Sequence, residues 1–179
     1  ANAFLATKVS FINAMAEIAE VSGADAVELA KAIGYDERIG NKFLRNGIGF
    51  GGGCLPKDIM GFVARAEELG AGEAVSFLKD VDAINQRRRA RVLALAEQEL
   101  GELKNKNVLL LGLSFKPDSD DMRDSPALDI ALRLAKAGAK VTVHDPVALS
   151  ALGDKHPELI KQQDLSAAAK DQELVILGT

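Results

Sequence analysis

Apolar residues recur at helical spacing through the first hundred residues. In residues 3–22 they return every three or four positions, the pattern of an amphipathic helix, and Gly23 is placed to end it. Asp25 is a residue type that caps helix starts, and Pro56 suits a first helical turn. We therefore expect helices over residues 3–22, 25–33, 56–69 and 73–100, with a loop and at most one helical turn over 35–53.

The pattern changes near Gly101 to short, continuous apolar runs bounded by turn residues. It predicts strands at residues 108–112, 140–144 and 174–177, and helices at 126–137 and 165–169. Alternation of strands and helices is typical of a parallel α/β sheet of Rossmann type. We therefore expect a mainly α central domain at residues 1–100, joined by its long last helix to a partial α/β Rossmann-like domain at residues 101–179.

Composition narrows the class of protein. The chain has 179 residues, 47% of them hydrophobic and 27% charged, with a net charge of −4. This is an ordinary globular composition, and the mild acidity gives no support for nucleic-acid binding. No apolar run is long enough to span a membrane, and a single cysteine fits a cytoplasmic location. The chain starts without Met and stops after an apparent strand, so we expect it to belong to something longer.

Charge is concentrated in two segments. Arg87, Arg88, Arg89 and Arg91 lie in the middle of the long helix, where a basic run usually forms a solvated face. The loop at residues 114–124 contains Lys116 and Arg123 beside the acids Asp118, Asp120, Asp121 and Asp124. It follows a predicted strand, where open α/β sheets bind ligands, so it is either a phosphate-binding loop or a solvated loop of mixed charge.

The single cysteine, Cys54, follows three glycines and precedes Leu55-Pro56-Lys57-Asp58. This places a thiol at a helix N-terminus, where free N–H groups and the helix dipole favour a thiolate. A buried, inert cysteine is the alternative interpretation. Asp58 falls on the first turn of the same helix, as a base or a water-positioning group, or simply as an acid that complements the dipole.

Other chemical motifs are weaker. The segment Gly47-Ile48-Gly49-Phe50-Gly51-Gly52 matches the dinucleotide fingerprint formally, but no strand precedes it, so we reject that interpretation. A cysteine hydrolase would need a histidine base, and His144 and His156 lack any local signature for it. With one cysteine and no His-x-x-x-His pair, the sequence predicts no metal site.

Several segments carry a resemblance to a known family. They are Ala1-Asn2-Ala3-Phe4-Leu5-Ala6, Asp36-Glu37-Arg38-Ile39-Gly40, Gly49 to Asp58, and Gly112-Leu113-Ser114-Phe115-Lys116-Pro117-Asp118 with Arg123. In this order they resemble the UDP-glucose/GDP-mannose dehydrogenase family of nucleotide-sugar 6-dehydrogenases, and residues 38–44 are most similar to its UDP-glucose branch.

The resemblance implies an architecture. Family members have an N-terminal NAD-binding domain, a central helical dimerisation region and a C-terminal Rossmann-like domain that holds the nucleotide sugar. The chain resembles the central region and the start of the C-terminal domain. We therefore expect a homodimer formed through the helical domain and no NAD-binding domain within these residues. The family's catalytic lysine would precede residue 1, and Lys8 is not at its motif position.

The resemblance also implies a reaction and its residues. The family oxidises the C6 alcohol of UDP-glucose to a carboxylate with two NAD⁺, through a cysteine thiohemiacetal and thioester. By this resemblance Cys54 is the nucleophile, Asp58 activates water, and Asn2 hydrogen-bonds in the catalytic site. The implied substrate contacts are Arg38, reaching across the dimer, Phe43, Gly51, Phe115 and Lys116, and Arg123 lies near the NAD pyrophosphate. The alternatives are a sibling enzyme for GDP-mannose or a UDP-N-acetyl-hexosamine, or a non-catalytic dimerisation module.

Overall fold

The computed structural model describes residues 1–179, which form two compact units. The first unit is Ala1–Arg88 and the second is Arg89–Thr179, so the division falls inside the long helix. The sequence pattern placed this division after residue 100. No helix is both long enough and apolar enough to cross a membrane.

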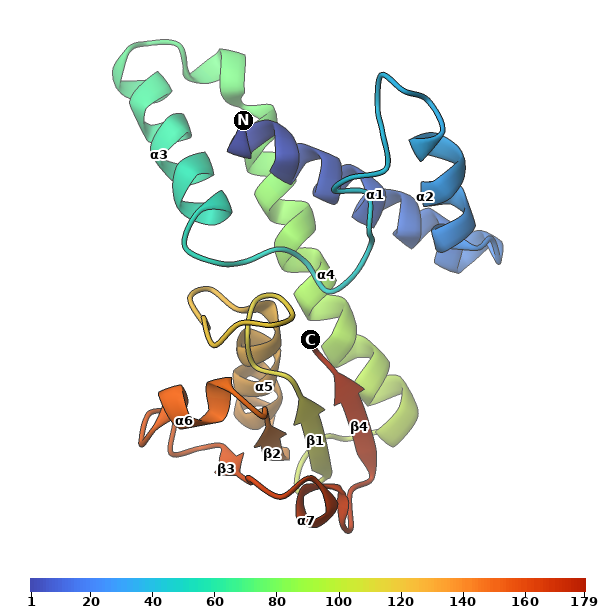
Figure 1. Ribbon diagram of the computed structural model, residues 1–179, viewed down its shortest axis with the longest axis vertical. Coiled ribbons are helices and arrows are strands. Elements are labelled where there is room, and N and C mark those ends of the chain that lie inside the picture. Colours follow the sequence, from blue (N-terminus) through green and yellow to red (C-terminus); the bar gives the residue numbers. More distant parts are fainter. The chain divides into compact units, whose positions relative to one another are not determined.

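The first unit consists of helices. They are α1 (Asn2–Ser22), α2 (Ala26–Gly34), α3 (Leu55–Glu68), the 3₁₀ helix η1 (Gly72–Val75) and the first part of α4 (Phe77–Leu100), as Figure 1 shows. Gly23 ends α1 in the left-handed conformation, and the Asp25 carboxylate caps α2 by accepting from the N–H groups of Val27 and Glu28. A buried cluster of Ala6, Phe50, Ile59, Ala66, Val75, Leu78 and Val81 joins α1, α3 and α4.

The single helix predicted over residues 73–100 is wrong at its start. Residues 72–75 form the 3₁₀ helix η1, and α4 begins at Phe77. The chain turns tightly here, because the N–H of Ala71 donates to the carbonyl of Ala66 and a Cβ on Gly72 would lie 2.8 Å from Cγ of Glu67. Val75 lies in the buried cluster although it belongs to η1. Its spacing from the apolar residues of α4 therefore resembled that of one continuous α-helix.

The second unit is a four-stranded parallel sheet in the order β3-β2-β1-β4. Its elements are β1 (Asn107–Leu111), α5 (Pro126–Lys136), β2 (Lys140–His144), α6 (Ala148–Leu152), β3 (Ile160–Lys161), α7 (Leu165–Ala169) and β4 (Leu174–Leu177). Val108 pairs with Val141 and with Leu174, so the two central strands and β4 are in register from their first apolar residues. The three predicted strands and the parallel α/β class are confirmed.

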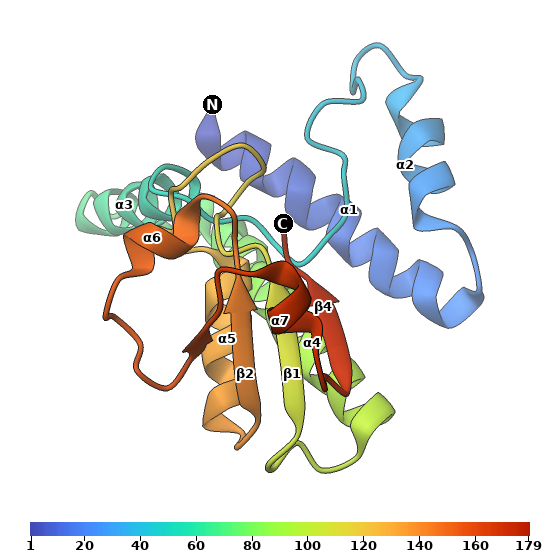
Figure 2. The same ribbon diagram turned by 60° about the horizontal axis from the view of Figure 1, so that its bottom comes forward.

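The sheet is doubly wound. Figure 2 shows α5 behind the sheet and α7 in front of it, and both helices contact β2. Right-handed crossovers require this arrangement, because the β1-to-β2 connection and the β3-to-β4 connection run in opposite directions across the sheet. The reversal lies between β1 and β4, and open α/β sheets bind ligands at the carboxyl ends of strands beside such a point.

Candidate active site

Cys54 is the N-cap residue of α3, as the sequence predicted. Leu55 and Pro56 form the first helical positions, and the Cys54 carbonyl accepts from the N–H of Asp58 at 2.9 Å. The side chain is exposed, so the interpretation of Cys54 as a buried core residue is wrong. The thiol therefore lies at the N-terminus of a 14-residue helix, where a reagent can reach it.

Asn2 and Asp58 meet beside this helix start, although 56 residues separate them. Nδ2 of Asn2, at the beginning of α1, donates to Oδ2 of Asp58 at 2.6 Å. Asp58 lies one helical turn beyond Cys54, and its Oδ1 accepts no hydrogen bond within the chain. The pair therefore presents a fixed carboxylate with a free oxygen close to the cysteine backbone.

Arg38 and Phe43 lie on the loop between α2 and α3. Nε and Nη2 of Arg38 donate to the two oxygens of Asp36 at 3.0 and 2.6 Å, and this lowers the pKa of Asp36. The Arg38 side chain is 88% exposed. Phe43 is half-exposed and adopts a left-handed backbone at φ 61°, which is unusual for a residue with a side chain. Neither residue bonds to Cys54, Asn2 or Asp58.

The basic run of α4 is not a uniform solvated face. Arg87 is exposed and pairs with Glu17, as expected. Arg88 is 10% exposed and pairs with Glu20, whereas Arg89 is 3% exposed and pairs with Asp124 and Asp129. The prediction is wrong for these two residues because it counted charge and ignored helical phase: Arg89 continues the buried stripe of Leu78, Val81 and Asn85.

In the second unit the loop after β1 carries Phe115, Lys116 and Arg123. The ammonium of Lys116 lies 5.5 Å from the centroid of the Phe115 ring and forms no ion pair in the chain. Arg123 instead donates through Nε and Nη2 to Asp121, at 3.0 and 2.7 Å, and it holds the pKa of Asp121 at about 2. The loop therefore contains an internal ion pair, between Arg123 and Asp121, and an exposed cation without one, Lys116.

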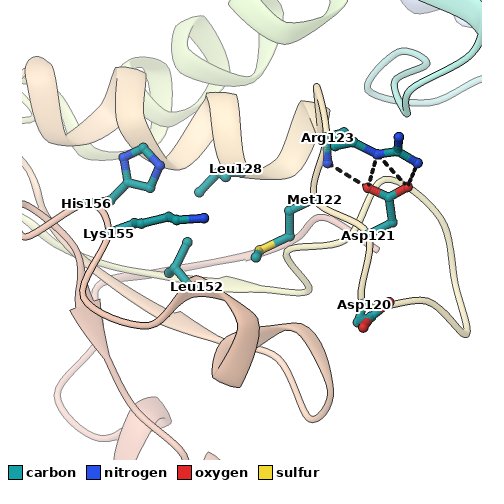
Figure 3. A pocket seen from close by; sticks show the side chains of 8 residues that line it. All are labelled: Asp120, Asp121, Met122, Arg123, Leu128, Leu152, Lys155 and His156. Carbon is teal, nitrogen blue, oxygen red and sulfur yellow. Dashed lines mark hydrogen bonds and ion pairs between the residues drawn. The ribbon is translucent and has the colours of Figure 1, made fainter.

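Arg123 also lines a cavity of about 530 Å³. Figure 3 shows the Arg123–Asp121 pair at one end of it, and Lys155 and His156 at the other, with Met122, Leu128 and Leu152 supplying apolar wall. His156 is partly exposed and lies 3.4 Å from Glu158 through Nδ1. The sequence gave Lys155 no role, since a lysine in a polar loop has no distinguishing signal.

A second cavity, of about 420 Å³, lies at the carboxyl ends of the strands. Its wall includes Gly112 after β1, His144 and Asp145 after β2, and Thr179 after β4. Nδ1 of His144 is 3.0 Å from the carbonyl of Gln162, which indicates a structural role for this ring. Gly112 has a φ of 86°, and a Cβ there would lie 2.8 Å from Thr179, so the close approach of the two strand ends requires glycine.

Asp145 anchors the floor of this second cavity. It is 5% exposed and accepts from the N–H groups of Leu113, Val147 and Ala148 at 2.7 to 2.8 Å. Burial raises the pKa of Asp145, but these N–H groups and that of Ser114 outweigh burial and lower it below 3.8. The carboxylate thus ties the start of the Phe115 loop to the start of α6.

Two family models match the chain. The model described as "UDP-glucose/GDP-mannose dehydrogenase family, central domain" matches residues 1–87. The model described as "UDP-glucose/GDP-mannose dehydrogenase family, UDP binding domain" matches residues 109–179. The two matches cover the helical unit and most of the sheet unit.

Individual relatives agree with the family models. UDP-glucose 6-dehydrogenase YwqF of Bacillus subtilis is 40% identical over 179 residues, which cover 99% of this chain and 40% of the relative. The structure of a UDP-glucose dehydrogenase from Pyrobaculum islandicum matches 99% of this chain and 41% of its own, with 38% identity and a TM-score of 0.91. A GDP-mannose dehydrogenase structure from Pseudomonas aeruginosa matches 99% of this chain and 42% of its own, at 28% identity and a TM-score of 0.67. The chain thus spans about 40% of the length of its relatives.

Proposed function

Because the chain belongs to the UDP-glucose/GDP-mannose dehydrogenase family, we propose that it supplies the covalent catalytic centre and the nucleotide-sugar site of an NAD-dependent UDP-glucose 6-dehydrogenase. The observation that carries the proposal is the meeting of Asn2 and Asp58 beside Cys54 at the start of α3. A nucleophile there has a fixed carboxylate one turn away, which is what hydrolysis of a covalent intermediate requires.

The chemistry divides between the sulfur and the carboxylate. The Cys54 thiolate adds to the C6 aldehyde of the sugar, forming a C–S bond while the carbonyl electrons move to oxygen, which gives the thiohemiacetal as its alkoxide. Loss of hydride from that carbon leaves a thioester, and water attacks it while Asp58 takes the water's proton. The C–S bond then breaks, which restores the thiolate and releases the sugar's carboxylic acid, and this acid loses its proton to solvent to give the carboxylate. NAD⁺, when bound, accepts one hydride when the alcohol becomes the aldehyde and a second from the thiohemiacetal.

Residues of the second unit fit two anionic groups. Arg123 and Lys155 line the cavity of about 530 Å³ beside the acids Asp120 and Asp121. Arg123 would hold the pyrophosphate of NAD in place of its present bond to Asp121. Lys116, free of any ion pair, would bind the diphosphate of the nucleotide sugar, with Phe115 as a further contact. In the first unit, the family resemblance makes Gly51 a proposed substrate contact. The 179 residues contain no strand–turn–helix with a dinucleotide fingerprint. The proposal for Arg123 therefore concerns the pyrophosphate of NAD and no other part of that cofactor.

The substrate is proposed as UDP-glucose over its siblings. Identity to the UDP-glucose relatives is 38 to 40%, against 28% to the GDP-mannose dehydrogenase. Residues 38–44, which include the proposed substrate contacts Arg38 and Phe43, are the segment most similar to the UDP-glucose branch.

A homodimer formed through the helical unit is also proposed. Phe4, Phe11 and Ile18 lie seven residues apart on α1 and are 70%, 48% and 56% exposed. This spacing aligns them on one helix face, and a row of exposed aromatic and aliphatic side chains is typical of a surface covered by a partner. The exposed side chain of Arg38 would then reach the substrate bound to the partner.

The proposal is tested by joining the chain to the dinucleotide-binding domain of a family member. The joined enzyme is expected to form two NADH per UDP-glucose consumed, and the variant Cys54→Ala is expected to form none beyond the first oxidation. The 179-residue chain alone is expected to form no NADH. Equal turnover by Cys54→Ala would refute the role of the thiol, and faster oxidation of GDP-mannose or a UDP-N-acetyl-hexosamine would reassign the substrate.

A further inference from the structure

The loop that leads to Cys54 is fixed by a side-chain amide. The N–H of Phe50 donates to Oδ1 of Asn85 at 2.7 Å, and the carbonyl of Phe50 accepts from Nδ2 of Asn85 at 3.0 Å. Only one orientation of the amide satisfies both bonds. Asn85 is 1% exposed, so water does not compete for either bond. The side-chain amide of Asn85 therefore pairs with both the N–H and the carbonyl of Phe50, as the backbone of a neighbouring β-strand would.

Phe50 is fixed at its side chain as well. It is 7% exposed and belongs to the buried cluster that joins α1, α3 and α4. Both its backbone and its ring are therefore held, four residues before the thiol. Between this fixed point and Cys54 lie only Gly51, Gly52 and Gly53, of which the first two are buried.

Gly49 shows how closely the loop approaches the amide. Its φ is 113°, and a Cβ there would lie 2.5 Å from Oδ1 of Asn85. A second fixed point precedes it, because the N–H of Gly47 donates to Oδ1 of Asn13 at 2.8 Å and its carbonyl accepts from Nε of Arg88 at 3.1 Å. Side chains of α1 and α4 thus hold the loop at two positions, and the one nearer the thiol depends on Asn85.

We propose that Asn85 is a positioning residue for Cys54. Three consecutive glycines have more accessible conformations than any other sequence, so without a fixed start they would not deliver the thiol to one place. The bonds from Asn85 to Phe50 supply that start, and they determine where the sulfur lies over the first turn of α3. The inference rests on the proposed function, in which this sulfur attacks the C6 aldehyde. A displacement of 1 Å in such an attack lowers its rate by about 100-fold.

The first test measures the loop itself. Asn85→Leu keeps the buried volume and removes both hydrogen bonds, and Asn85→Ala removes the volume as well. Ser10→Ala is the matched control, because Oγ of Ser10 is equally buried and donates to the Val81 carbonyl of α4 at 2.8 Å, away from the glycine loop. Hydrogen exchange at the Phe50 amide is expected to be about tenfold faster in Asn85→Leu than in Ser10→Ala. Equal exchange in the two variants would overturn the proposal.

The second test measures the thiol, which is unambiguous because the chain has one cysteine. Alkylation of Cys54 by iodoacetamide is expected to be about threefold slower in both Asn85 variants, because the thiol loses its place at the helix start, and unchanged in Ser10→Ala. Unchanged alkylation in Asn85→Leu, with faster Phe50 exchange, would also overturn the proposal, since the anchor would not act on the sulfur.

A third measurement separates this inference from the proposed function. The wild-type chain is mixed with the C6 aldehyde of UDP-glucose, labelled with ¹³C at C6, and the thiohemiacetal carbon is followed by NMR. Capture is expected to be about 100-fold slower in Asn85→Leu and unchanged in Ser10→Ala. If the wild-type chain captures no aldehyde, the proposed function fails, whereas differences in exchange and alkylation between the variants would still support Asn85 as the residue that positions the thiol.

Discussion

At the scale of single residues, hydrogen-bond partners distinguish the carboxylate of Asp58, a catalytic candidate, from that of Asp145, which is structural. One carboxylate oxygen of Asp58 accepts a hydrogen bond from Asn2 and the other accepts none, whereas both oxygens of Asp145 accept from backbone N–H groups. A carboxylate that is saturated by backbone donors holds structure, and one with a free oxygen can take a proton from water. The two acids therefore call for opposite tests, one of chemistry and one of stability.

Asp58→Asn is expected to stop the reaction after the thioester. An amide side chain can still accept from Nδ2 of Asn2, so the local structure is kept, but it cannot take the proton of the attacking water. In the enzyme joined to a dinucleotide-binding domain, turnover should fall by about 100-fold or more. Mass spectrometry should then find the sugar acid attached to Cys54. A slow variant with an unmodified cysteine would contradict this role.

Asp145→Asn is expected to lose stability at neutral pH, by about 2 kcal/mol, because charged acceptors are replaced by a weaker one. Since the folded-state pKa of Asp145 lies below 3.8, its contribution is complete above the ordinary carboxyl pKa and is lost as the pH falls through the folded value. The gap between wild type and variant in urea unfolding should therefore shrink below about pH 4.

Asp120→Asn serves as the control for this pH dependence, because Asp120 is exposed and forms no hydrogen bond. It should unfold at the wild-type urea concentration throughout the range. A gap between Asp145→Asn and wild type that stays constant from pH 7 to pH 3 would show that the Asp145 charge does not stabilise the fold.

At the scale of elements, the sequence predicted the helices and strands whose apolar pattern extends over enough residues to be recognised. The long helices and the strands of four or five residues are where the apolar pattern placed them. The helix α6 and the strand β3, with five and two residues, were not predicted, although the equally short α7 was. Two to five residues carry too little periodicity to separate such an element from a loop. The positions of Cys54 and Asp58 on α3 followed from Pro56 and the glycines, but the role of Asn85 did not.

Asn85 and Arg89 had a signal that the sequence analysis did not use. Both stand on the stripe of α4 that contains Leu78 and Val81, where apolar residues are expected. A polar side chain at a core-facing position is costly unless it has a partner, so such positions point to buried polar contacts. The identity of those partners, Phe50 for one and Asp124 with Asp129 for the other, depends on tertiary structure and could not be read from spacing.

Arg89→Met is therefore expected to destabilise the sheet unit by about 2 kcal/mol. The buried guanidinium donates to Asp124 and Asp129, joining α4 to the start of α5, and methionine fills its space without bonding either carboxylate. Arg87→Met, on the same helix but in an exposed pair with Glu17, should change stability by less than about 0.5 kcal/mol. Thermal unfolding followed by circular dichroism compares the two. Equal shifts would mean that burial of the arginine makes no difference.

At the scale of the whole molecule, the exposed face of α1 has consequences for assembly. A monomer would leave Phe4, Phe11 and Ile18 in water along one face of a 21-residue helix whose other residues supply the core. Burying such side chains stabilises association by roughly 1.5 to 3 kcal/mol for each one fully covered, before the entropic cost of bringing two chains together. The dimer proposed through this helical unit would cover this face.

Phe11→Glu is expected to convert the dimer to a monomer, because a charge at the centre of the row would be buried without a partner. Phe62→Glu is the matched control, since Phe62 is 52% exposed on α3 and lies outside the row. Sedimentation equilibrium at micromolar chain concentrations should give twice the chain mass for wild type and Phe62→Glu, and the single mass for Phe11→Glu. Dissociation by Phe62→Glu alone would place the interface on α3 instead of α1. The Lys8 ammonium donates to the Ile39 carbonyl, which holds the Arg38 loop against α1. An interface on α3 would therefore leave Arg38 without its proposed route to the partner's substrate.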